Sequence, residues 1–192
     1  MVLSSIASAM ARVKAVLRKH PQAGIVGDAA ALSNWRGGLR VVTQYAGGAE
    51  AITDMPVELG GSGDQPSPGW LLRAALASCA VTRIAMSAAE AGIDLQRLEA
   101  SAHSRSDARG LLDLPDSDGR ALFAGPGELS LRVRIAASGV APERLRMLVE
   151  QSIALAPVSQ ALAQALGVAL RVDVDVDLAV AAGVSAGLPP AL

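Results

Sequence analysis

The 192-residue sequence is poor in cysteine, histidine, aromatic residues and net charge, and each shortage excludes a class of protein. Its single cysteine, Cys79, excludes an internal disulfide framework and favours a reducing, cytoplasmic location. Aromatic residues make up 2% and the net charge is -1, so the chain lacks the stacking side chains and the basic surface that nucleic-acid binding needs. The two histidines, His20 and His103, have no companions at metal-ligand spacing, and we expect neither a metal nor another cofactor.

Membrane and export signals are also missing from the sequence. No uninterrupted run reaches the roughly 18 apolar residues that span a bilayer, and the first residues lack the charged start and apolar centre of a secretory signal. Residues 1–24 instead predict an N-terminal amphipathic helix with basic residues near its end. Its apolar stripe consists of Ile6, Met10, Val13 and Leu17. We expect this helix to pack on the body or on a partner subunit rather than on a membrane.

Hydrophobic periodicity predicts an α+β protein, with residues 25–192 forming a single domain. The expected elements, in chain order, are a hairpin over 39–59, a helix over 68–91, strands over 97–106 and 128–136, a helix from Pro142 that breaks at Pro157 and ends at Gly167, and a strand over 170–180. Each of the three later strands alternates apolar with polar residues, which is typical of an antiparallel sheet covered on one side. Residues 104–128 are expected to form a loop or hairpin.

The last predicted strand carries aspartate at three alternate positions, Asp173, Asp175 and Asp177. A calcium loop needs turn-forming glycine and a distant bidentate glutamate, so this row does not predict a calcium site. We expect the three carboxylates to face solvent near Arg132 and Arg134 on a neighbouring strand.

The helix over 68–91 is apolar on every side. Ser67 is its candidate N-cap, Pro68 suits the first helical position and Gly92 is placed to end it. A helix of this kind needs cover on every face, and one sheet covers only one of them. We therefore expect an obligate homodimer in which a second subunit supplies the remaining cover.

Cys79 lies in the middle of this helix, where a lone cysteine most often acts as a small hydrophobic residue. Arg83, four residues later on the same face, would favour the reactive thiolate. Apolar neighbours such as Leu72, Leu76 and Met86 would favour the neutral thiol by desolvation. The sequence leaves open which effect prevails, and whether Arg83 is catalytic or an ion-paired interface side chain.

Two segments, taken together, resemble a known family. The stretch "PSPGWLLRAALASCAVT" resembles the first cysteine segment, and "APVSQAL" the second, of the family that includes osmotically inducible protein C and the organic hydroperoxide resistance proteins. The stretch "NWRGG" at 34–38 and the strand "GVALRVDVDV" agree with the order of that family. The resemblance covers roughly residues 33–178, and its specificity lies in the separation of the paired motifs.

The resemblance implies an OsmC-like fold, in which antiparallel sheets surround a long buried central helix and two subunits intertwine as a homodimer. It also implies that a thiolate attacks an organic hydroperoxide, and that a second cysteine resolves the sulfenic acid to a disulfide. Cys79 occupies the position of the attacking cysteine. This chain has Ala156 where the family has the second cysteine, and Gly69 where hydroperoxide-reducing members have an acidic residue. Those members also use an arginine from the first hairpin, a region that here contains Arg36 and Arg40.

Two functions remain open at this point. The first is a one-cysteine, thiol-dependent hydroperoxide reductase of oxidative-stress defence, with Cys79 and Arg83 as catalytic residues and an external thiol as reductant. Its substrate pocket is expected to contain Leu72, Leu76, Met86, Ala156 and Ser159. The second is a non-catalytic dimer of the same fold that binds a small apolar ligand or has a structural role.

Overall fold

The computed structural model describes residues 2–164 and 167–173. Its helices are α1 (Val2–Lys19), α2 (Pro68–Glu90), α3 (Ala108–Leu111), α4 (Pro142–Ile153) and α5 (Pro157–Ala163), with short 3-10 turns at Pro21–Gly24 and Val57–Leu59. Its strands are β1 (Leu32–Trp35), β2 (Val41–Gln44), β3 (Glu50–Thr53), β4 (Leu95–Arg105) and β5 (Glu128–Ala137). The combination of helices with antiparallel sheets confirms the predicted α+β class.

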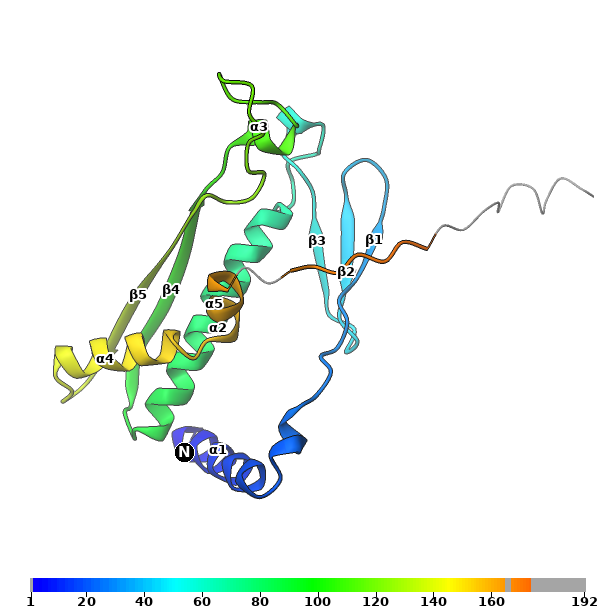
Figure 1. Ribbon diagram of the computed structural model, residues 1–192. Coiled ribbons are helices and arrows are strands. Elements are labelled where there is room, and N and C mark those ends of the chain that lie inside the picture. Colours follow the sequence, from blue (N-terminus) through cyan, green and yellow to red (C-terminus); the bar gives the residue numbers. More distant parts are fainter. Residues whose placement is uncertain (1, 165–166, 174–192) are drawn as a thin grey trace, which may run out of the picture.

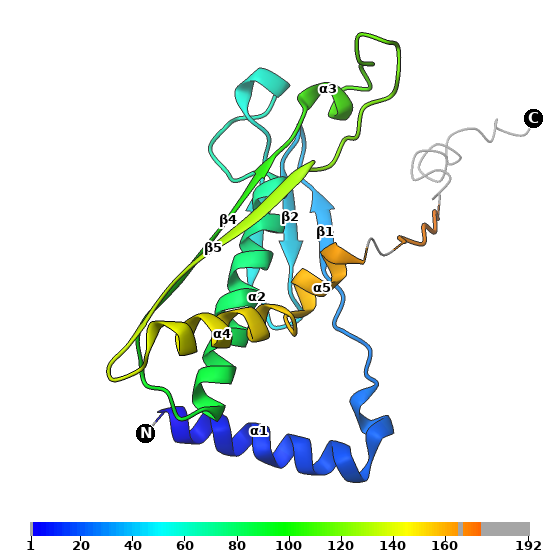
Figure 2. The same ribbon diagram turned by 60° about the vertical axis from the view of Figure 1, so that its left-hand side comes forward.

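The strands form two antiparallel sheets, one in the order β1-β2-β3 and the other made of β4 and β5. The long helix α2 runs between these two sheets (Figure 1). Helix α4 crosses α2 on the same side of the β4–β5 sheet, and α1 lies across the far end of α2 (Figure 2). Helix α2 is therefore the element that joins the parts of the chain, since it contacts β4, α1, α4 and α5.

The boundaries of α2 follow from local signals. The hydroxyl of Ser67 accepts a hydrogen bond from the Trp70 N–H at 3.3 Å, so the predicted N-cap is present. Pro68 occupies the first position, where its missing N–H leaves no intrahelical bond unmade. Gly92 follows the helix with a φ of 64°, a left-handed conformation that glycine adopts without strain. The predicted helix is thus confirmed to within one residue at its C-terminal end.

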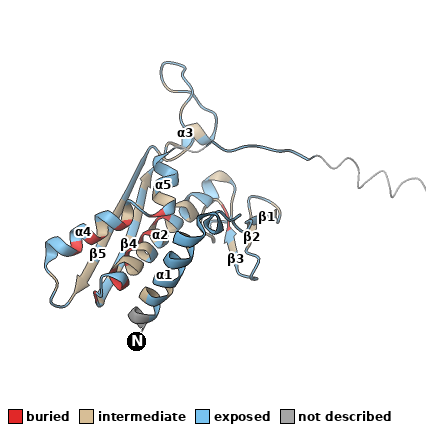
Figure 3. Ribbon diagram, turned by 60° about the horizontal axis from the view of Figure 1, so that its bottom comes forward, coloured by how far each residue is buried: buried red, intermediate tan, exposed pale blue. Residues whose placement is uncertain are grey.

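One stripe of α2 forms the core of the described structure. Leu76, Ala80, Ile84 and Ala88 recur every fourth residue, and all four are buried. Figure 3 shows buried positions along α2 and α4 where the two helices cross. The apolar residues gathered at the lower end of this stripe are Ile93, Leu95, Ile135, Ala137, Val140, Leu145 and Leu148. Each fully buried aliphatic side chain contributes about 1.5–3 kcal/mol, so this stripe anchors α2 to the β4–β5 sheet and to α4.

Within one chain, α2 is fully buried along one stripe and only partly covered elsewhere, as expected for a helix that one sheet covers on one side. Five of its 23 residues are buried, and Trp70 near its start is 49% exposed. The β1–β2–β3 sheet also leaves Trp35 and Ile52 exposed. A single chain therefore covers α2 in part, through its contacts with β4, α1, α4 and α5.

The other predicted elements agree with the structure in part. The first hairpin is confirmed, since β2 and β3 meet at a turn in which Gly48 has a φ of 87°. The predicted loop over 104–128 contains the short helix α3, which begins at an N-cap formed by Asp107. Helix α4 ends as expected before Pro157, and α5 restarts at that proline.

The predicted C-terminal strand over 170–180 does not form in the part of it that the structure describes. Residues 167–173 have no regular secondary structure, and the rest of the predicted strand, with two of its three aspartates, lies outside the described residues. Asp173 lies 3.8 Å from Arg171 instead of beside the arginines of β5. In Figure 2, residues 167–173 run clear of the helices and sheets.

A network of charged groups ties the first hairpin to the loop before α2. Arg40 donates hydrogen bonds from Nη2 to Asp54 at 3.3 Å and to Ser62 at 2.6 Å, and it also pairs with Asp64. The Ser62 hydroxyl donates to the buried Asp54 carboxylate at 2.6 Å. Hydrogen bonds from Arg40 and Ser62 lower the pKa of Asp64 from its ordinary value of 3.8 to about 2. The Ser62 hydroxyl likewise lowers the pKa of Asp54.

We expect this network to stabilise the folded chain by an amount that decreases as the pH falls into the acid range. Because the pKa of Asp64 is lower in the folded chain, the contribution is complete above about pH 4 and is lost as the pH falls towards 2. Replacing Arg40 by methionine removes the main cause of this shift. We expect Arg40→Met to be less stable than the parent at pH 7, and to lose less stability than the parent between pH 4 and pH 2. Urea unfolding between pH 2 and pH 7 measures both effects, and Arg36→Met, at an exposed arginine, is the control. If the stability of the parent, Arg40→Met and Arg36→Met fell equally between pH 4 and pH 2, the prediction would be wrong.

Candidate functional site

A pocket of about 480 Å³ contains the thiol of Cys79. Its wall on α2 consists of Ala75, Ser78, Cys79, Thr82, Arg83 and Met86, which lie on one face because they are spaced three or four residues apart. The opposite wall consists of Leu155, Pro157 and Val158, from the turn between α4 and α5 and from the start of α5. Cys79 is half-buried in this pocket and has no disulfide partner, since it is the only cysteine of the chain. The thiol thus lies on a face of α2 next to the core stripe, towards α5.

Arg83 is the charged residue of this pocket. Its Nη1 atom is buried and has no hydrogen-bond partner among the residues that the structure describes. Within the same part of the chain, no hydrogen bond joins Arg83 to Cys79, although both side chains line the pocket. A buried guanidinium nitrogen without a partner costs free energy, so this group is poised to bind a negative charge that enters or develops in the pocket.

The second motif lies against this pocket, as the sequence indicated. Ala156 is fully buried, and its two chain neighbours, Leu155 and Pro157, both line the wall opposite Cys79. Ser159 is half-buried two residues beyond Pro157, and its hydroxyl is buried with no partner among the described residues. The short helix α5 therefore brings the "APVSQAL" segment to the thiol.

Four of the five predicted pocket residues do not line the Cys79 pocket: Leu72, Leu76, Ala156 and Ser159. Leu76 is buried in the core stripe of α2, and Leu72 lies one turn before it on the same stripe; neither lines the Cys79 pocket. Met86 does line it, as predicted. Leu76 and Thr82, three residues before and after Cys79, lie on different faces of the helix. The sequence did not show which of these faces is buried in the core and which lines the pocket.

The arginines of the first hairpin do not line the Cys79 pocket within one chain. Arg40 is held by Asp54 and Asp64, and Arg36 is exposed beside the turn between β1 and β2. His103 lies on β4 with its Nε2 atom 3.2 Å from the Ser101 hydroxyl, on the polar face of the β4–β5 sheet. The polar groups that line the thiol pocket therefore come from α2 itself.

Helix α2 is long and apolar enough, by length and composition alone, to cross a membrane. This differs from the expectation that no run would be long enough, because α2 is apolar on average although it carries the two charges of Arg73 and Arg83. A core helix meets the same test, and the contacts of α2 with β4, α1, α4 and α5 identify it as one.

Comparison with solved structures shows the same fold. An OsmC-like protein from Mycoplasma pneumoniae aligns with a TM-score of 0.60 at 13% identity, over 72% of this chain and 89% of that one. An organic hydroperoxide resistance protein from Elizabethkingia anophelis aligns with a TM-score of 0.52 at 21% identity, over 72% of this chain and 89% of that one. A protein from Legionella pneumophila, described as the organic hydroperoxide resistance protein OsmC, aligns with a TM-score of 0.51 at 20% identity, over 71% of this chain and 91% of that one.

The comparison of sequences is more specific than the comparison of folds. No curated protein matches this chain significantly. Residues 61–171 match the family described as OsmC-like protein, and this range runs from the loop before α2, through both pocket walls, to the residues beyond α5. The match spans more than half of the chain and includes Cys79 and the segment opposite it. The chain therefore belongs to the OsmC-like protein family.

Proposed function

We propose that this chain is a one-cysteine, thiol-dependent reductase of organic hydroperoxides that acts in oxidative-stress defence. The observation that carries the proposal is the position of Cys79, half-buried in a largely apolar pocket that it shares with Arg83. Membership of the OsmC-like family supports it, and two structures with this fold are described as organic hydroperoxide resistance proteins. The apolar wall of the pocket suits the organic part of a hydroperoxide. We also propose that the protein acts in the cytoplasm, where thiol reductants are available.

In the proposed reaction, the Cys79 thiolate attacks the terminal oxygen of the hydroperoxide. The O–O bond breaks, the alcohol leaves after taking up a proton, and Cys79 becomes a sulfenic acid. A first external thiol then forms a mixed disulfide with Cys79 and releases water. A second thiol attacks that disulfide, which regenerates Cys79 and releases the oxidised reductant. The reductant must be external because the chain has no second cysteine and Ala156 occupies the position of the resolving one.

We assign to Arg83 the role of stabilising the negative charge that develops in this reaction. Its guanidinium lies in the same pocket as the thiol, one helical turn away, and one of its nitrogens has no hydrogen-bond partner in the described part of the chain. Negative charge appears first on the thiolate and then on the departing alkoxide. A cation beside both positions lowers the free energy of the transition state more than that of the neutral thiol.

The proposal includes a homodimer. The structure of one chain leaves large apolar residues exposed on α2, on the β1–β2–β3 sheet and beside the Cys79 pocket, including Trp70, Trp35 and Leu155. Exposed apolar surface of this extent is typical of an interface with a permanent partner. A second subunit against α2 would cover these residues and narrow the pocket.

A non-catalytic role is the second candidate, and a specific observation favours it. Arg40 is held by two carboxylates at the end of β3 and in the following loop, Gly69 replaces an acidic residue, and no second thiol is present. In this alternative, the Cys79 pocket binds a small apolar ligand and the thiol does not react.

The activity of a Cys79→Ser variant distinguishes the two candidates. We expect the parent protein to reduce cumene hydroperoxide with a dithiol, and Cys79→Ser to lose this turnover, because serine cannot form a sulfenic acid. Mass spectrometry of the intact parent after one equivalent of hydroperoxide should show the addition of one oxygen atom. Ser78→Ala is the matched control, since Ser78 is the preceding residue and lines the same pocket. Equal turnover in the parent and in Cys79→Ser would exclude the catalytic proposal.

Two Arg83 variants extend this experiment. Arg83→Met should lower kcat/KM roughly tenfold, because the cation that stabilises the developing negative charge is lost. Arg83→Lys should retain most of the activity because it keeps the positive charge. An equal loss in Arg83→Met and Arg83→Lys would assign Arg83 to packing instead of charge.

The Ala156→Cys variant tests the geometry of the second motif. The two residues that flank Ala156 line the wall opposite Cys79, and a disulfide requires Cα atoms within about 7 Å. We expect mild peroxide treatment to form an intramolecular disulfide in this variant, and dithiol-dependent turnover to rise modestly, since the acidic residue is still missing. Thiol counting before and after peroxide measures the outcome. Two thiols that persist would show that position 156 does not face Cys79.

The oligomeric state is tested by light scattering. We expect a dimer at micromolar concentration that buries more than about 2,000 Å², because the exposed apolar stripe of α2 is unfavourable in water. Trp70→Asp should weaken the dimer, whereas Arg120→Asp on an exposed turn should not. A monomeric parent protein would contradict the prediction.

A further inference from the structure

Two separate parts of the chain are attached to the two ends of α2. Helix α1 lies at the C-terminal end, where Lys14 pairs with Glu90, the last residue of α2. The connection between β4 and β5 lies at the N-terminal end (Figure 1), where Arg73 donates a hydrogen bond to Ser104 at 3.0 Å. Because α2 has 23 residues, about 34 Å of helix separates the two parts within one chain.

The second half of α1 is basic and uncovered. Val2–Lys19 contains no acidic residue, and its four basic residues all lie between positions 12 and 19. Apart from Lys14, none of them forms an ion pair with a residue that the structure describes. Val13 is 56% exposed and Val16 is 52% exposed, and their spacing puts them on one face of the helix. This half of α1 therefore presents apolar side chains beside uncompensated positive charge.

Residues 106–127, which we call the arm, connect β4 to β5 and have the complementary character. Four large apolar side chains of the arm are between 50% and 72% exposed: Leu111, Leu112, Leu114 and Phe123. The arm also contains four aspartates, Asp107, Asp113, Asp116 and Asp118, but only two arginines. The arm therefore combines exposed apolar surface with an excess of negative charge.

Internal contacts give the arm a defined shape. Asp107 caps α3, and the Asp116 carboxylate accepts a hydrogen bond from the Arg120 N–H at 2.8 Å. The two halves of the arm pack closely, since a Cβ atom at Gly110 would lie 2.6 Å from the carbonyl oxygen of Phe123. A structured arm that holds four large apolar side chains in water is typical of a surface that a partner covers.

We propose that the arm of each subunit docks on the second half of α1 of the other subunit. The inference rests on the homodimer of the proposed function and adds the contacts that form the two ends of that dimer. The apolar side chains of the arm cover Val13 and Val16 of the partner subunit. The carboxylates of the arm lie beside the unpaired basic side chains of that helix, Arg12, Arg18 and Lys19.

The relative direction of the two α2 helices follows from these charges. A two-fold axis perpendicular to α2 makes the helices antiparallel, so each arm meets the partner's α1 and the contact forms twice. A two-fold axis along α2 would instead bring the two basic helices together at one end and the two acidic arms together at the other. Repulsion between like charges disfavours that arrangement.

A membrane is a less complete partner for α1. An amphipathic helix with basic residues and no acidic ones also suits a surface of anionic lipids. A membrane bound to α1 would leave the apolar side chains of the arm in water, because the arm lies at the other end of α2. A second copy of the chain covers both surfaces at once.

Crosslinking between subunits tests the contact. In a Cys79→Ser background, Val16→Cys is combined in turn with Leu112→Cys and Leu114→Cys and treated with a short bismaleimide. Both double variants should give covalent dimers on a denaturing gel, and each single variant should stay at monomer mass. Glu143→Cys, at an exposed position of α4, replaces Val16→Cys in the control pairs and should give no dimer.

The possible results separate this inference from the homodimer itself. Covalent dimers in neither Val16 pair, or a crosslink within one chain, would overturn the docking. If light scattering showed a dimer in the same samples, the homodimer would stand without it. A protein that is monomeric by light scattering would overturn both.

Charge exchange provides a second test that does not need cysteines. Reversing the three unpaired charges with Arg12→Glu, Arg18→Glu and Lys19→Glu should raise the dissociation constant of the dimer about tenfold at low salt. Asp113→Lys with Asp118→Lys in the arm should also weaken the dimer, and combining both sets should recover at least half of the loss. Sedimentation velocity measures each constant, and additive losses would contradict the docking.

Vesicle binding tests the membrane alternative. The parent protein should not sediment with phosphatidylglycerol vesicles at physiological ionic strength, because the arm covers α1 in the dimer. Phosphatidylcholine vesicles are the uncharged control. Sedimentation with the anionic vesicles alone, abolished in the variant with three reversed charges on α1, would overturn the proposal and assign α1 to a lipid surface.

Discussion

The structure depends on one helix that serves two purposes. One stripe of α2, from Leu76 to Ala88, is buried against the β4–β5 sheet and α4, and a neighbouring stripe carries Cys79 and Arg83 towards α5. Because both stripes belong to the same rigid element, the packing of the first determines the position of the second. The thiol is therefore placed by the core and not by a flexible loop, which is the arrangement that a reactive group needs.

The short helix α5 completes the Cys79 pocket because the chain ends α4 before Pro157 and turns back towards α2. Pro157 cannot continue α4, so the chain turns at Ala156 and restarts as α5 against α2. This turn places Leu155, Pro157 and Val158 opposite the thiol. The position at which the family resemblance implies a resolving cysteine is filled by a fully buried alanine, so in the proposed reaction a molecule from outside the chain would reduce an oxidised Cys79.

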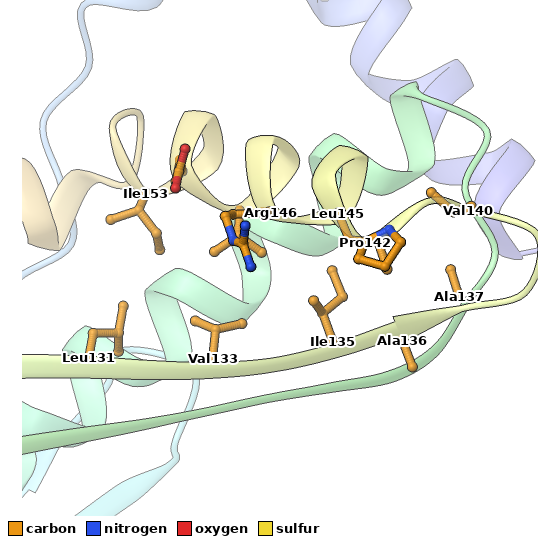
Figure 4. Close-up of a pocket in the computed structure, with 12 residues that line it drawn as sticks. Leu131, Val133, Ile135, Ala136, Ala137, Val140, Pro142, Leu145, Arg146 and Ile153 are labelled. Atoms are coloured by element: carbon orange, nitrogen blue, oxygen red, sulfur yellow. The ribbon is translucent and has the colours of Figure 1, made fainter.

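Two apolar surfaces of the single chain are not covered by other parts of the described structure, and they differ in shape. The exposed part of α2 and the β1–β2–β3 sheet present broad apolar surface with large aromatic residues such as Trp35 and Trp70, which suits a second subunit. The space between β5 and α4 is a groove lined mostly by apolar residues of these two elements (Figure 4). The first surface lies beside the thiol pocket and bears on its chemistry, whereas the second bears on the packing of α4 against the β4–β5 sheet.

The sequence by itself determined those features that depend on short spacings. The N-cap at Ser67, the stop at Gly92, the alternation of β5 and the break at Pro157 are local effects of side-chain chemistry, and each was predicted. The family also followed from the sequence, because two motifs at a characteristic separation carry it. Tertiary structure alone decided that Leu76 belongs to the core while Met86 lines the pocket, and that Arg40 is held by Asp54 and Asp64. These outcomes depend on which residues distant in the chain pack against each helix face, and a helix that is apolar on every side gives no local signal of that choice.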